Sequence, residues 1–457
     1  MLFETITSAG IAHNSYIVGS GGNAAVIDPR RDCEIYLEIA DRADLSISHI
    51  FETHRNEDYV IGSQELSARC GAEIYRGARI PFLYGNPVKD GDKFTLGSLE
   101  LSVLETPGHT EESISLVVRD RDVSPEPYMV FCGDTLFCGD IARTDFFGTP
   151  RKGEMAAKIF DSITTKILPL GDGVIVCPAH GAGSICGGDI ADHPLTTVGY
   201  EKKTNRLLLA GKEMFIRQRI DESPYIPPYF IQMEQYNRDG APILGHIPHL
   251  KPLGIMDVNN LKRSGAQIVD IRSPTGFAAG NITGSLSIWR DGIPAFAGWF
   301  LDYQRPVVLV DDFNTGLYFV LRHFIRLGYD NITGYLAGGF PAWFKGAQEI
   351  ATIGACSVQQ LKERLETESP CILDVRDIKN YNSVGHIRGA HHIYVGELPT
   401  HLSEVPKNEP IFVYCDAGYK GSLAASYLTM NHYHHITNVL GGMQAWKRAG
   451  YQIEKSL

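Results

Sequence analysis

The feature that most constrains the fold is an internal repeat in the last two fifths of the chain. Asp270 and Asp374, 104 positions apart, each follow an apolar stretch, and each precedes an arginine by two residues. Two further segments recur behind them, Gly-x-Ile-x-Gly at 280–284 and 385–389, and Gly-Gly-x-x-Ala-Trp at 338–343 and 441–446. Three matches in the same order predict two copies of one domain.

Each copy has the pattern of a small α/β domain. Short continuous apolar runs at 307–310 and 411–414 are typical of strands in a parallel sheet that is covered on both faces. A chain of 457 residues has room for about three domains, so the part before the repeat forms another domain of alternating strands, turns and helices. The predicted division is a first domain over 1–235, a linker over 236–255, and the two copies over 256–350 and 351–457.

Composition and charge exclude several classes of protein. Hydrophobic residues make up 44% of the chain and charged residues 21%, as in a folded globular protein. The net charge of −11, without a run of lysine or arginine, argues against a nucleic-acid partner. No run of about 18 apolar residues predicts a membrane span, and the first residues do not resemble a secretory signal. We expect a cytoplasmic homo-oligomer that does not bind membranes.

Polar residues follow several apolar stretches of the first domain. His54, His109, Asp134 and His180 each come after such a stretch, and Asp58 lies in the same turn as His54. Loops at one edge of a sheet can converge on one ion, and imidazole with carboxylate is a ligand set for zinc, iron or manganese. The sequence therefore predicts a metal site.

The segment 53–59, Thr-His-Arg-Asn-Glu-Asp-Tyr, resembles the Thr-His-x-His-x-Asp-His motif of the metallo-β-lactamase superfamily. The resemblance covers roughly residues 1–230 and implies an αββα sandwich. Two histidines of the motif are replaced, by Asn56 and Tyr59, which are poor substitutes for neutral imidazole. A two-metal hydrolytic site, as in a hydroxyacylglutathione hydrolase, is therefore not expected.

His54, His109 and Asp134 remain, and two histidines with one carboxylate match the facial triad of non-haem Fe(II) oxygenases. They also match the ligands of the superfamily's persulfide dioxygenase branch, whose Gly-Asp and Gly-Arg-Thr-Asp-Phe stretches resemble 133–134 and 142–146. The resemblance implies one Fe(II) per chain, with zinc as the alternative in the isolated protein. Three further residues are expected to position ligands or their loop without binding the metal: Asp58, His180 and Arg143.

The second predicted site is a cysteine between an apolar strand and a helix. At such a turn the sulfur of Cys415 faces the unpaired N–H groups of the helix, whose dipole stabilises a thiolate or persulfide anion. With the Asp374-x-Arg motif and the 441–442 glycine pair, this loop resembles that of the rhodanese sulfurtransferases. The resemblance implies that Cys415 is the nucleophile. The residues expected to bind the substrate are Asp416, Ala417, Gly418, Tyr419 and Lys420.

Three departures qualify this resemblance. Asp416 adds a negative charge and Lys420 stands where arginine is commoner, so a small persulfide is expected to suit the loop better than thiosulfate. In the first copy, the position that matches Cys415 is Asp311, which we expect in a surface loop. A carboxylate cannot carry a sulfane sulfur, so 256–350 is expected to be an inactive rhodanese-like domain.

Over nearly the whole chain, this domain order resembles the fusions of persulfide dioxygenase and rhodanese domains that act in bacterial sulfide detoxification. The resemblance implies a persulfide dioxygenase and thiosulfate sulfurtransferase that acts on a thiol persulfide and O₂ and forms sulfite and thiosulfate. Two alternatives stay open, a mononuclear zinc thioester hydrolase with a sulfurtransferase domain and a non-catalytic sulfur carrier or sensor. The carrier thiol, whether glutathione, coenzyme A or another, stays open too.

Overall fold

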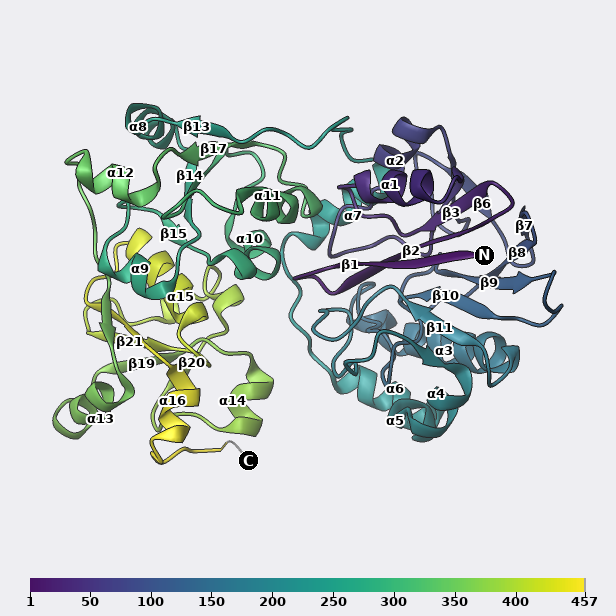
Figure 1. Cartoon of the computed structure of the whole chain (residues 1–457). Coiled ribbons are helices and arrows are strands. Elements are labelled where there is room, and N and C mark those ends of the chain that lie inside the picture. The colour runs from purple at the N-terminus through teal and green to yellow at the C-terminus, as the bar shows by residue number, and fades with distance from the viewer. Residues whose placement is uncertain (456–457) are drawn as a thin grey trace. The chain divides into compact units, whose positions relative to one another are not determined.

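The computed structural model describes residues 1–455 (Figure 1). The chain divides into two compact units, one of residues 1–248 with 325–328 and one of residues 249–324 with 329–457. Within the described residues, no helix is both long and apolar enough to cross a membrane.

The first unit contains two six-stranded sheets, with the strand orders β1-β2-β3-β4-β5-β6 and β12-β11-β10-β9-β8-β7. The strands of the first sheet are β1 (Leu2–Ser8), β2 (His13–Ser20), β3 (Asn23–Ile27), β4 (Ser46–Glu52), β5 (Glu73–Gly77) and β6 (Asn86–Val88). Those of the second are β7 (Lys93–Leu96), β8 (Leu99–Glu105), β9 (Ile114–Asp120), β10 (Met129–Gly133), β11 (Ile175–Pro178) and β12 (Thr196–Thr197).

Alternation along the strands explains why the two sheets stack between helices. In β2, Tyr16 and Val18 enter a core shared with Phe131 of the second sheet, whereas Ile17 packs with Tyr36 of the covering helix α1. The helices of this unit are α1 (Glu34–Arg42), α2 (Ser63–Cys70), α3 (Lys152–Ser162), α4 (Val198–Thr204), α5 (Arg206–Leu209), α6 (Lys212–Asp221) and α7 (Phe230–Asp239). Residues of α3 and α6 share a third core with the second sheet. The layers are therefore αββα, as the sequence predicts.

The second unit contains one parallel five-stranded sheet for each copy of the repeat. The first copy has the order β13-β17-β16-β14-β15, with β13 (Lys251–Leu253), β14 (Gln267–Asp270), β15 (Leu286–Ser287), β16 (Val307–Val310) and β17 (Ile332–Leu336). Its helices are α8 (Ile255–Arg263), α9 (Pro274–Ala279), α10 (Ile293–Phe300), α11 (Leu317–Arg326) and α12 (Gly339–Lys345).

The second copy repeats this topology with the order β18-β22-β21-β19-β20. Its strands are β18 (Gly354–Cys356), β19 (Cys371–Asp374), β20 (His391–His392), β21 (Ile411–Tyr414) and β22 (Ile436–Val439). Its helices are α13 (Val358–Thr367), α14 (Ile378–Val384), α15 (Tyr419–Met430) and α16 (Gly442–Arg448). The predicted repeat is therefore a repeat of fold.

Secondary structure extends into the predicted linker of 236–255. Helix α7 continues to Asp239, and β13 pairs with β17 and so belongs to the sheet of the first copy. A three-residue strand that contains Pro252 has no local pattern that predicts it, because only its pairing defines it.

Candidate active sites

The predicted metal ligands lie in loops that follow strands of both sheets in the first unit. His54 follows β4, His109 follows β8 and Asp134 follows β10, and all three side chains are buried. The Nε2 atoms of His54 and His109 lie 3.8 Å and 3.5 Å from Oδ2 of Asp134. The structure thus brings the three predicted ligands together.

Hydrogen bonds hold both imidazoles in one tautomer. The Thr53 hydroxyl donates to Asp28 at 2.6 Å and lies 2.9 Å from Nδ1 of His54, so this nitrogen carries a proton and donates to the hydroxyl. Nδ1 of His109 lies 2.9 Å from the carbonyl oxygen of Arg143, which can only accept. Each ring, when neutral, therefore presents the lone pair of Nε2, as metal binding requires.

Burial and neighbouring groups shift the pKa values of the three predicted ligands. Burial lowers the pKa of His54 to about 3, so its ring is neutral near pH 7. Burial raises the pKa of Asp134, but the charges of His180 and His54 outweigh this and hold that pKa well below its usual range. Burial lowers the pKa of His109, and a contact with Glu57 more than reverses this, to about 8. Asp134 is therefore an ionised acceptor at neutral pH.

His180, Asp58 and Arg143 surround the predicted ligands. Nδ1 of His180 lies 2.8 Å from Asp134, and its Nε2 lies 3.0 Å from Asp58. The Arg143 guanidinium donates twice to Asp145, each time at 2.7 Å, while its carbonyl accepts from His109. Contacts of this kind orient metal ligands, and the positioning role of these three residues stays a prediction that the geometry supports.

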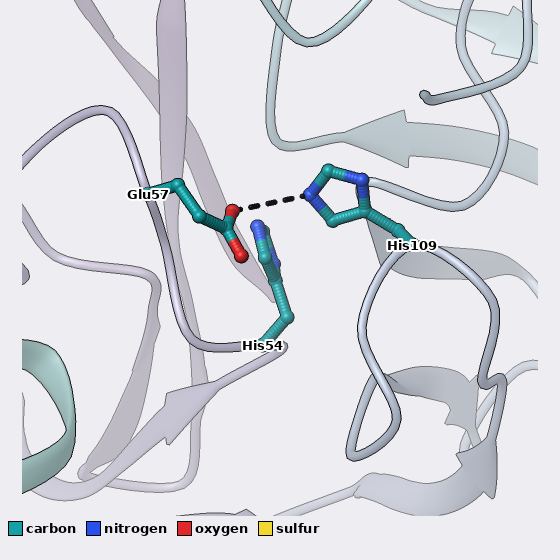
Figure 2. A group of neighbouring side chains, drawn as sticks. All are labelled: His54, Glu57 and His109. Atoms are coloured by element: carbon teal, nitrogen blue, oxygen red, sulfur yellow. Dashed lines mark ion pairs between the residues drawn. The ribbon is translucent and has the colours of Figure 1, made fainter. Parts of the chain in front are cut away.

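Two residues that the sequence analysis missed also lie at this site. Oε2 of Glu57 is 3.4 Å from Nε2 of His109, and Figure 2 shows this ion pair passing beside the ring of His54. The donor atoms of these three residues lie within 4.8 Å of one another, as do those of His109, Asp134 and Cys186. Glu57 occurs in a polar stretch and Cys186 in a glycine-rich one, so no local pattern distinguishes either from a surface residue.

A metal ion fits the polar atoms that converge here. Among the described residues, Nε2 of His54, Nε2 of His109 and both carboxylate oxygens of Glu57 are buried without a hydrogen-bond partner. Buried polar atoms without partners are destabilising, and a bound cation removes that penalty. Imidazole and carboxylate together suit zinc, iron or manganese.

Asn56 and Tyr59 are hydrogen-bonded to protein groups. The Asn56 amide donates to the carbonyl oxygen of His54 at 3.3 Å, and the Tyr59 hydroxyl lies 2.8 Å from Nε2 of His13. Both residues are buried, and these contacts pair the Asn56 NH₂ group and the Tyr59 phenol, whereas Oδ1 of Asn56 has no hydrogen-bond partner among the described residues.

The second site is the loop between β21 and α15. Cys415 is buried, and the N–H of Gly418 donates to its sulfur at 3.1 Å. Gly418 has φ of 103°, a conformation that favours glycine. A Cβ on Gly442 would lie 2.1 Å from the carbonyl oxygen of Cys415, so the glycine pair lets α16 approach the loop.

The five residues predicted to bind the substrate directly follow Cys415 in the chain, and their contacts differ. Asp416 and Lys420 form an ion pair of 2.9 Å, so the ammonium offsets the carboxylate beside the cysteine. The carbonyl of Ala417 accepts from the N–H of Gly441 at 3.2 Å. Tyr419 is exposed, and its ring lies 5.2 Å from that of Trp289 in the first copy.

Asp311 takes the place of the cysteine at the end of β16. The expectation of a surface loop is wrong at this residue, because Asp311 is buried and accepts from Arg290 at 2.6 Å. The buried carboxylate therefore has a cationic partner where the second copy has a thiol.

Comparisons with known proteins identify both parts of the chain. Residues 9–180 match the family model of the metallo-beta-lactamase superfamily, and residues 257–345 and 357–449 each match the model of the rhodanese-like domain. A metallo-beta-lactamase from Staphylococcus aureus is 30% identical, with a TM-score of 0.65 over 74% of this chain and 99% of that one. Hydroxyacylglutathione hydrolase GloC of Haemophilus influenzae is 29% identical over 41% of this chain and 87% of its own length. ETHE1 from Myxococcus xanthus is 27% identical, with a TM-score of 0.46 over 54% of this chain and all of that one.

Proposed function

The chain belongs to the metallo-β-lactamase superfamily and carries two rhodanese-like domains, and from this premise we propose that it is an iron-dependent persulfide dioxygenase joined to a sulfurtransferase. The first activity oxidises a thiol persulfide to sulfite. The second moves sulfane sulfur through Cys415. Together the two activities would serve sulfide detoxification.

The proposal of the dioxygenase activity rests on one observation about the residues at the predicted metal site. His54, His109 and Asp134 converge, whereas Asn56 and Tyr59, which stand where dinuclear hydrolases of this superfamily have histidines, are hydrogen-bonded to protein groups. Two histidines and one carboxylate are the donor set of non-haem Fe(II) oxygenases. A bound ferrous ion would supply the redox chemistry that O₂ needs and an attachment point for the substrate sulfur.

The overall reaction balances without a further reductant. Persulfide, O₂ and water give thiol, sulfite and two protons, and the four electrons that the sulfane sulfur loses reduce O₂. The protein's part is to hold the ligands in one geometry, through Thr53, the Arg143 carbonyl and His180. The surrounding burial keeps competing water away from them.

The second activity rests on the position of Cys415 at the start of α15. Its thiolate attacks the sulfane sulfur of a persulfide, the carrier thiolate leaves, and a persulfide forms on the Cys415 sulfur. Sulfite then attacks the outer sulfur, which releases thiosulfate and restores the thiolate. The N–H of Gly418, already 3.1 Å from the sulfur, and the helix dipole stabilise the anion in each step.

A zinc thioester hydrolase is the second candidate, because a hydroxyacylglutathione hydrolase is among the similar proteins. It would use the same three ligands, with a metal-activated water in place of O₂. The two candidates therefore differ in the metal and in the co-substrate.

The experiment uses the iron-loaded full chain with glutathione persulfide in an oxygen electrode, together with metal analysis. We expect one O₂ consumed for each sulfite formed. His109→Ala is expected to lose both iron and O₂ uptake, because a site without this imidazole holds Fe(II) too weakly. Full zinc occupancy with thioester hydrolysis and no O₂ uptake would contradict the dioxygenase.

A further inference from the structure

The carboxylate of Glu57 has the surroundings of a metal ligand. The side chain is fully buried, and neither oxygen has a hydrogen-bond partner within the described part of the chain. Apart from His109, its cationic neighbour is Arg55, whose Nη2 lies 3.9 Å from Oε1 and 3.4 Å from the carboxylate of Glu234. A carboxylate removed from water needs a compensating charge, and this distant, shared guanidinium supplies little.

Buried glutamates elsewhere in the first unit show what ordinary burial requires. Oε1 of Glu112 accepts from the backbone N–H of Arg55 at 2.8 Å, and Glu52 accepts from the Tyr84 hydroxyl at 3.0 Å. Each has a protein donor of its own. Glu57 instead faces Nε2 of His109, an atom that presents a lone pair when the ring is neutral and Nδ1 donates to the Arg143 carbonyl. Two lone pairs aimed at one another repel unless a proton or a cation lies between them.

Three separations between the donor atoms fit neighbouring positions around one ion. Donor atoms about 2.1 Å from a common metal lie roughly 3 Å apart when adjacent and about 4.2 Å apart when opposite. The separations here are 3.4 Å for Glu57 to His109, 3.5 Å for His109 to Asp134 and 3.8 Å for His54 to Asp134. Figure 2 shows the carboxylate of Glu57 directed at the space that the two rings share.

We propose that Glu57 is a fourth protein ligand of this metal, so that the centre has two histidines and two carboxylates. This inference deepens the proposed function and rests on its metal site. A second carboxylate neutralises a divalent cation completely and strengthens its binding. It also leaves one position fewer for substrate and O₂ than a three-residue site does.

The test measures metal affinity and coordination in the full chain, independently of turnover. Fe(II) affinity is determined by anaerobic competition with a chelator, and the visible spectrum of the Co(II)-loaded protein reports coordination. For Glu57→Gln we expect at least a 10-fold weaker affinity and a changed Co(II) spectrum, since even residues that only support ligands change affinity about 10- to 100-fold. Glu57→Asp keeps the negative charge, so its Fe(II) affinity should lie between those of Glu57→Gln and the wild type.

Glu112→Gln is the matched control, because Glu112 is also buried and loses the same charge while its amide oxygen can still accept from Arg55. We expect its affinity to change less than twofold. An unchanged affinity and spectrum for Glu57→Gln would overturn the proposal and leave Glu57 as a partner of protonated His109. A wild-type chain that binds neither metal would instead refute the metal site of the proposed function, so the two failures are distinguishable.

Discussion

The two rhodanese-like copies share a scaffold and differ at the position that carries chemistry. In each, a buried arginine holds the aspartate two residues before it, at 2.7 Å for Arg272 with Asp270 and 2.6 Å for Arg376 with Asp374. Each arginine also donates to a glycine carbonyl of the following loop, at 2.6 Å and 2.8 Å. These groups hold the carboxyl ends of β14 and β19 in place, whether or not a cysteine lies nearby.

The strand that ends at the nucleophile position is where the copies diverge. Helix α15 begins four residues after Cys415, whereas α11 begins six residues after Asp311. The first-copy loop is thus longer, and its carboxylate is bound by Arg290 rather than by a backbone N–H. The two copies therefore keep the same Asp-Arg pair although only the second has a cysteine at this position. Tyr419 beside Trp289 places a ring of the first copy next to the second copy's loop.

The largest effect is expected from Cys415→Ser. A hydroxyl ionises far less than a thiol and cannot carry a sulfane sulfur, so thiosulfate formation should fall to the uncatalysed rate. Persulfide-dependent O₂ uptake should continue, because the metal site lies in another domain. Chromatography of sulfite and thiosulfate would show sulfite accumulating in place of thiosulfate.

The control for this substitution is the reaction without enzyme, since sulfite and persulfide can react in solution. If Cys415→Ser formed thiosulfate faster than that control, the division into an active and an inactive copy would be wrong.

The sequence was sufficient for the repeat and for the position of Cys415 between a strand and a helix, because both depend on local patterns, while the role of Cys415 as nucleophile stays a prediction. A buried parallel strand is a continuous apolar run, and the residue at its end is marked by the glycines and helix behind it. The same reasoning placed His54, His109 and Asp134 at strand ends, and these three converge. Their roles as ligands stay predictions.

Burial by distant segments could not be predicted. Glu57 lies in a run of polar residues, and its burial comes from loops that are far away in the chain. Asp311 was expected at the surface, yet Arg290, 21 residues earlier, covers it. Strand β13 exists only through its pairing with β17. Each of these features depends on tertiary contacts that leave no periodic trace in the sequence.

The Asp-Arg pairs should contribute similarly to the stability of the two copies. The variants Asp374→Ala and Asp270→Ala test this. Each substitution removes the main carboxylate partner of a buried guanidinium, which costs about 3–5 kcal/mol in such pairs, although Arg272 keeps a second contact of 3.5 Å with Asp312. Hydrogen exchange measured on peptides of each copy would report the local loss of stability. We expect Asp374→Ala to lower the stability around β19 and β21, and Asp270→Ala to lower the stability around β14 and β16 by a similar amount.

Sulfur transfer separates the two variants further. Asp374→Ala should lower thiosulfate formation because it loosens the strand next to Cys415, and Asp270→Ala should lower it much less. If both variants lost thiosulfate formation equally, the first copy would contribute directly to sulfur transfer at Cys415.

The smallest effect is expected from Asp311→Ala. The carboxylate is buried, but its partner Arg290 is 30% exposed and can turn toward water when the pair is broken. Such partly exposed pairs contribute up to about 1 kcal/mol, so hydrogen exchange around β16 should rise only slightly. Thiosulfate and sulfite yields should equal those of the wild type, because Asp311 has no nucleophilic sulfur to lose. A loss of thiosulfate without a loss of stability would show that this carboxylate takes part in sulfur transfer, and the first copy would no longer count as inactive.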